Sequence, residues 1–90
     1  MLYLVSYDLK GGASSDYQAL YDEFTTFDGC MKSLESSWLV KTNLGCKEVR
    51  DKLYAKMGAD DYIVVVPYAN PRSAILPARI VNWIRENIDS

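Results

Sequence analysis

The chain has 90 residues, a formal net charge of -2, a charged fraction of 24% and no histidine. A chain of this length forms one domain, and its composition is that of a globular protein rather than a disordered one. Without histidine, Ser-His and Cys-His nucleophile pairs are excluded, and any metal must be held by oxygen, which suits Mg²⁺, Mn²⁺ or Ca²⁺. The acidic balance does not indicate nucleic-acid binding by the surface as a whole.

No apolar stretch of about 18 residues is present, so the sequence predicts no membrane span and no membrane partner. The N-terminus has neither the basic lead nor the long apolar run of a signal peptide, and we expect a cytoplasmic protein. Cys30 and Cys46 are then expected to be reduced thiols, because the cytosol disfavours disulfides. Two isolated cysteines without a CxxC motif do not predict a zinc site.

The first predicted element is a strand over residues 2–8, LYLVSYD, and a glycine-containing loop follows it. Successive side chains of a strand point to opposite faces of the sheet. One face is expected to carry Leu2, Leu4, Ser6 and Asp8, and the other Tyr3, Val5 and Tyr7.

An amphipathic helix comes next, because apolar residues recur at spacings of three and four over residues 17–27. We expect Ser15 to cap its N-terminus and Asp28-Gly29 to end it. Two short strands are then predicted near residues 31–34 and 37–42, with a bend between them.

A second amphipathic helix is predicted over about residues 46–57, with Gly58 as a left-handed terminator. Residues 62–68, YIVVVPY, are the strongest strand signal, and their continuous apolar run is typical of a strand covered on both faces. A third helix is predicted over about residues 77–88, with Pro77 at its first position.

This order of elements predicts an α+β fold, a ferredoxin-like βαββαβ sandwich over residues 1–68. The loop and extra C-terminal helix, residues 69–90, are expected to pack on the same domain. The two helices of the sandwich cover one face of the antiparallel sheet, yet the last strand is apolar on both sides. The second face of the sheet could be covered by the C-terminal helix or by a second subunit, and we expect a homodimer.

The stretches YLVSYDL, SSW and LVKTN, in this order and spacing, resemble the CRISPR-associated spacer-acquisition nuclease family over roughly residues 1–68. The resemblance is closer to that family's stand-alone relatives, the SinR-like and virulence-associated protein D groups. The SinR-like relatives share a tail of the LPARIVNWIREN type. The resemblance implies a ferredoxin-like fold and a homodimer formed through the sheet face.

In members with nuclease activity, the family's key acid is the aspartate that ends the first strand, which binds a divalent ion facing its symmetry mate. By this motif Asp8, preceded by Tyr7, is the catalytic and metal-binding candidate. The family's Ser-x-Phe corresponds to Ser36 and Trp38. Where the CRISPR members carry arginines just after the first strand, this chain has only Lys10.

Asp8 has two interpretations. As a metal ligand it would hold Mg²⁺, which orients water and stabilises charge on a phosphate. Asp60 and Asp61 would then be further ligands, because the last strand of this fold runs antiparallel beside the first and should bring them near Asp8. As a structural residue, Asp8 would end the strand and hydrogen-bond the following loop.

Lys10 and Trp38 are the candidates for nucleic-acid contact, through charge and base stacking. Packing in the core or at a subunit interface is the alternative for Trp38. Two functions follow from these observations. The first is a homodimeric binding or regulatory module with weak or no catalysis and no cofactor. The second is a Mg²⁺-dependent endonuclease, acting on RNA or DNA with Asp8 from each subunit.

Overall fold

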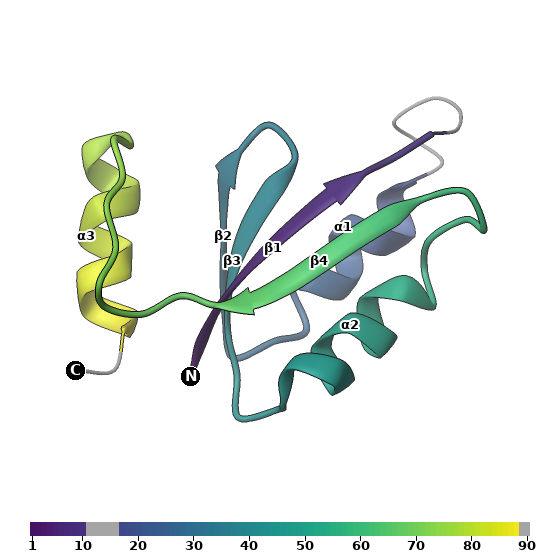
Figure 1. The fold of residues 1–90 in the computed structure, drawn as a ribbon, viewed down its shortest axis with the longest axis horizontal. Coiled ribbons are helices and arrows are strands. Elements are labelled where there is room, and N and C mark those ends of the chain that lie inside the picture. Colours follow the sequence, from purple (N-terminus) through teal and green to yellow (C-terminus); the bar gives the residue numbers. More distant parts are fainter. Residues whose placement is uncertain (11–16, 89–90) are drawn as a thin grey trace.

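The computed structural model describes residues 1–10 and 17–88. Within them, one antiparallel sheet has the strand order β2-β3-β1-β4, which makes an α+β fold (Figure 1). No helix in these ranges combines the length and the apolar character needed to cross a membrane. In chain order the elements are β1 (Leu2–Asp8), α1 (Gln18–Phe24), β2 (Gly29–Leu34), β3 (Ser37–Lys41), α2 (Cys46–Tyr54), β4 (Tyr62–Pro67) and α3 (Ala78–Asn87).

Each predicted element forms, but α1 and α2 end earlier than their apolar spacing suggests. After α1 the N–H groups of Thr25, Thr26 and Phe27 bond to carbonyls three residues back, so the chain tightens into a turn. The end of α2 tightens in the same way. Ser15, the predicted N-cap, lies outside the described residues.

Gly58 differs from its predicted role, because its backbone does not have the positive φ of a left-handed terminator. Its N–H donates instead to Asp61 Oδ2 at 2.7 Å. A Cβ added at Gly58 would come within 3.2 Å of that same oxygen. The close approach of the Asp61 side chain, rather than the backbone conformation, therefore explains why a glycine occupies position 58.

We define the inner face of the sheet as the face that carries Tyr3, Val5 and Tyr7. The helices α1 and α2 cover this face and build the main core against it. Phe24 of α1 is completely buried, and its ring stacks on that of Trp38 with centroids 4.4 Å apart and planes 4° apart. The two faces that the alternation of β1 predicts are present, and the structure shows that the helices α1 and α2 cover the one with Tyr3, Val5 and Tyr7.

The outer face carries Leu2, Leu4, Ser6 and Asp8, and α3 covers part of it. Ile80 and Ile84 of α3 are buried in a second cluster with Leu2 and Leu39. Figure 1 shows α3 at the β2 and β3 side of the molecule, away from α1 and α2. Among the described residues, neither α3 nor any other element buries the outer side of β4, so of the two predicted covers the C-terminal helix is not the one for this strand. The exposed residues are Tyr62 (67%), Val64 (53%) and Val66 (41%).

Candidate functional site

Asp8 ends β1 on the outer face, directly opposite Tyr62 of β4. Its side chain is 63% exposed, and its Oδ2 lies 2.7 Å from Lys10 Nζ. An exposed ion pair of this kind contributes about 0–1 kcal/mol to stability. The fold therefore does not depend on this pair, and both side chains are accessible to a ligand.

Asp61 is close to this edge of the sheet but has a different environment. It is only 5% exposed. Its Oδ1 accepts the backbone N–H of Lys10 at 2.8 Å, and its Oδ2 accepts the N–H of Gly58 at 2.7 Å. Both carboxylate oxygens thus hold backbone donors, which offsets the cost of burying the charge. Asp61 joins the end of β1 to the turn before β4.

The three predicted metal ligands do not converge within one chain. The antiparallel pairing of β1 with β4 brings Asp61 to the loop after Asp8, as the strand order requires. Asp60, next to it, is exposed. Among the described residues, no group of three or more His, Cys, Asp and Glu side chains is arranged to hold a metal ion. A Mg²⁺ ion at Asp8 would draw its remaining ligands from water or from a second subunit.

A shallow depression of about 250 Å³ surrounds Asp8 on the outer side of β1 and β4. The Lys10 ammonium lies 5.9 Å from the centroid of the Tyr62 ring, a cation–π distance. A carboxylate, an ammonium and an aromatic ring therefore share one accessible surface, which suits binding of a polar ligand. The depression is lined by Ser6, Tyr7, Asp8, Tyr62, Ile63 and Val64.

Trp38 lies on the inner face, opposite to the face of Asp8. Besides stacking on Phe24, its Nε1–H donates to the Tyr7 hydroxyl at 3.2 Å. Burial raises the pKa of that hydroxyl, so Tyr7 stays protonated at neutral pH. Ser36 contributes its carbonyl oxygen, which accepts the Tyr7 N–H at 3.0 Å. The structure thus gives the Trp38 side chain partners on the inner face, while Ser36, which is exposed, takes part through its backbone only.

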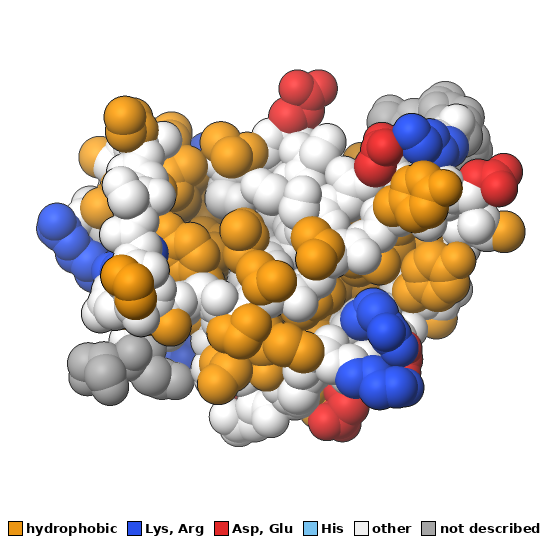
Figure 2. Space-filling view, viewed as in Figure 1, with side chains coloured by type: hydrophobic (Ala, Val, Ile, Leu, Met, Phe, Trp, Pro, Cys, Tyr) orange, Lys and Arg blue, Asp and Glu red, His pale blue; other side chains and the backbone are white. Residues whose placement is uncertain are grey.

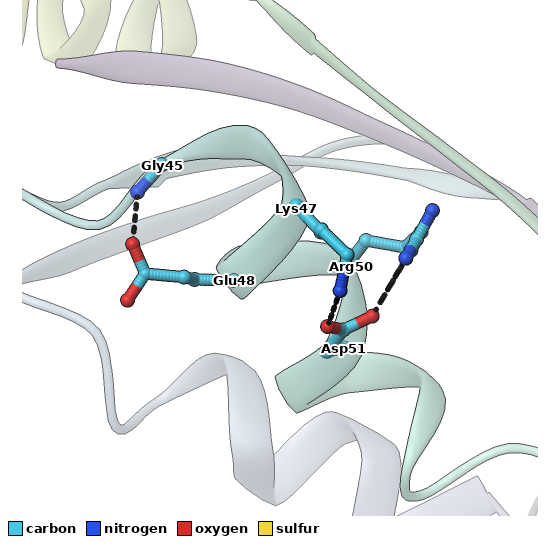
Figure 3. Close-up of polar contacts among 5 residues, drawn as sticks. All are labelled: Gly45, Lys47, Glu48, Arg50 and Asp51. Carbon is cyan, nitrogen blue, oxygen red and sulfur yellow. Dashed lines mark hydrogen bonds and ion pairs between the residues drawn. The ribbon is translucent and has the colours of Figure 1, made fainter.

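The cationic side chains of α2 are largely paired with acids of the same helix (Figure 3). Lys47 Nζ lies 2.8 Å from Asp51 Oδ2, and the Arg50 guanidinium contacts Asp51 Oδ1 at 2.9 Å. Hydrogen bonds from Lys47 and Arg50 hold the pKa of the Asp51 carboxyl below its usual value. Glu48 accepts the N–H of Gly45 at 3.2 Å, at the start of the helix. This helix therefore does not offer an unpaired basic face for nucleic acid.

The sequence predicted that β4 is apolar on both sides, and the structure shows which of its residues stay exposed on the outer face. We call Tyr62, Val64 and Val66 the outer strip. Figure 2 shows hydrophobic side chains gathered over the region between α3 and β4. Leu34 (62% exposed) and Ile75 (completely exposed) also contribute apolar surface on the described part of the chain. The signal was present in the uninterrupted VVV run, but only the placement of α3 decides which face stays open.

A scan against protein-family models finds no matching family, and a search of the curated proteins finds no match.

Proposed function

We propose that this chain is a homodimeric binding module of ferredoxin-like architecture, with weak or no catalysis, related to the stand-alone members of the CRISPR-associated nuclease family. The outer strip carries this proposal, because its three residues are 41% to 67% exposed on one strand. Contiguous exposed apolar surface on a small domain marks an interaction site. The strand order β2-β3-β1-β4, with α1 and α2 on the inner face, supports the ferredoxin-like description.

A second copy of the chain is the partner that fits this surface best. β4 is an edge strand of the sheet. Exposed apolar edge strands invite association with other strands, so they are normally covered. A two-fold interface places the same patch of each subunit against the other, and an apolar strip is complementary to itself. Leu34 and Ile75 would add to the buried surface.

The position of Asp8 favours a second candidate, a Mg²⁺-dependent endonuclease for RNA or DNA. Asp8 lies opposite Tyr62, and Ser6 lies opposite Val64, so the carboxylate shares its face with the outer strip. A dimer formed through that strip would direct the Asp8 carboxylates of both subunits toward one interface. Two carboxylates and bound water can hold Mg²⁺, which would orient water and stabilise charge on a phosphate.

Light scattering of purified protein at micromolar concentration tests the dimer. We expect the mass of a dimer for the wild type and of a monomer for Val64→Lys, because a charge on the outer strip opposes its burial. The control is Tyr54→Lys, since Tyr54 is 43% exposed on α2, away from the strip. A monomeric wild type, or a Val64→Lys variant that stays dimeric, would overturn this arrangement of subunits.

A further inference from the structure

The chain that leaves β4 folds back along α3, and the two segments enclose a pocket of about 160 Å³. Arg72 enters from the connecting loop, and Arg85 enters from the last turn of α3. The remaining wall is mainly apolar and half-buried or buried. It includes Tyr68, Leu76, Val81 and Ile84.

Neither arginine has a carboxylate partner in the described part of the chain. Arg72 donates to the amide oxygen of Asn70, and its guanidinium lies 6.0 Å from the Tyr68 ring centroid. Both contacts position Arg72 without neutralising its charge. Arg85 has no such contact with the residues that the structure describes, and among them its guanidinium is available to a ligand. By contrast, Lys10, Lys47, Arg50 and Lys52 pair with acids.

The chemistry of these two side chains selects an oxyanion. A guanidinium presents N–H donors in a planar fork that matches the oxygens of carboxylate, phosphate or sulfonate groups. Pockets for drug-sized ligands begin at about 300 Å³, so this smaller pocket accommodates one charged group with a limited apolar part. Tyr68 and Leu76 form part of its wall, so the pocket also favours contact with an apolar part of the ligand.

A second hollow continues from this pocket on the outer face of the sheet. It has a volume of about 280 Å³ and shares Tyr68, Ala74 and Leu76 with the arginine pocket. Its other walls are mostly apolar and include Leu4 and Leu39. A ligand whose charged group lies at the arginines can therefore extend apolar atoms along the same loop.

We propose that Arg72 and Arg85 bind the oxyanion group of a small amphipathic organic anion, whose apolar part packs against Tyr68 and Leu76. The arginine pocket is formed within one chain, and its lining includes neither Asp8 nor any residue of the outer strip. Inorganic phosphate would contact the same two guanidinium groups, without the apolar contribution to binding.

The probe for this site is 8-anilinonaphthalene-1-sulfonate, an aromatic sulfonate whose fluorescence rises in apolar surroundings. We expect saturable binding to the full chain, and a loss of affinity of about fivefold to tenfold in Arg72→Ala and in Arg85→Ala, because each removes a charged hydrogen-bond donor. Inorganic phosphate, added at constant ionic strength, should compete with the probe in the wild type but not in the double variant.

Two controls separate this pocket from other surfaces. Arg79→Ala removes an exposed arginine of the same helix that contacts Met31 rather than the pocket, and Val64→Lys alters the outer strip. Both should bind the probe as the wild type does. The proposal fails if the double variant binds the probe with unchanged affinity, or if Arg79→Ala weakens binding as much as Arg85→Ala. It also fails if the wild type does not bind the probe.

Discussion

The Asp61 carboxylate accepts the backbone N–H of Lys10 at 2.8 Å, across 51 positions of sequence. This bond connects the second residue after β1 to the turn that precedes β4. Asp61 is buried, and its other carboxylate oxygen accepts the N–H of Gly58. The carboxylate therefore stabilises the fold by bonding two backbone N–H groups. Asp60, its neighbour in sequence, is exposed. Two aspartates that are adjacent in the sequence therefore have different environments: Asp61 is buried and bonds backbone N–H groups, and Asp60 is exposed.

Replacing Asp61 by Ala should lower the free energy of unfolding by about 2 to 3 kcal/mol, because two backbone N–H groups lose their acceptor. Asp60→Ala is the matched control, and it should change the stability by less than about 0.5 kcal/mol, as surface substitutions usually do. Urea denaturation followed by circular dichroism measures both. Equal, small effects in the two variants would show that Asp61 does not hold this turn.

Asp8→Asn should leave the stability within about 0.5 kcal/mol of the wild type, because its ion pair with Lys10 is exposed. Wild type and variant are incubated with single- and double-stranded RNA and DNA, with Mg²⁺ or with a chelator. A binding module shows the same trace activity in both proteins. Metal-dependent cleavage that disappears in Asp8→Asn, but not in Asp60→Asn, would replace the binding module with the endonuclease, provided the dimer persists.

Phe24→Ala should cost about 3 to 5 kcal/mol, because Phe24 is completely buried and stacks on Trp38. Small domains are stable by only about 5 to 15 kcal/mol, so this loss brings the chain close to unfolding. Phe24→Leu keeps much of the volume and should cost less than Phe24→Ala. Chemical denaturation gives the order, with the exposed Tyr54→Ala as control. A mild effect of Phe24→Ala would contradict its place at the centre of the core.

The ion pair between Glu23 of α1 and Lys52 of α2 makes stability depend on pH. A hydrogen bond from Lys52 lowers the pKa of the Glu23 carboxyl from its usual 4.5. Since the folded pKa lies below the unfolded one, the contribution is fully present above the unfolded pKa and is lost as the pH falls through the folded pKa.

Glu23→Gln should therefore reduce the free energy of unfolding by about 1 kcal/mol at neutral pH, a value kept low because the Lys52 side chain is 35% exposed. The difference from the wild type should shrink in acid, and denaturation at a series of pH values measures it. Glu35→Gln, at an exposed position, is the control and should have little effect at neutral pH. A difference that stays constant from neutral pH into acid would rule out this linkage.

Local periodicity predicted much of the fold. The alternation in residues 2–8 assigned Tyr3, Val5 and Tyr7 to one face, and α1 and α2 cover that face. The helix ends were less predictable, because Thr25 and its neighbours leave the helix through bonds to carbonyls three residues back. The prediction for Gly58 was wrong because it considered only the local backbone. The position is small because the Asp61 side chain, three residues later, lies close to it, and not because Gly58 has a positive φ.

The amino-acid sequence by itself determined the order of the elements and the parity of each strand, and its resemblance to a known family singled out Asp8 as the residue to test. Element order and parity are local properties, because a side chain's face follows from its position in a strand or helix. Only the tertiary structure decided that α3 covers Leu2 and Leu39 but leaves the outer strip open. It also decided that Arg72 and Arg85 line one pocket. Such relationships depend on how distant segments pack together, and no local periodicity specifies that packing.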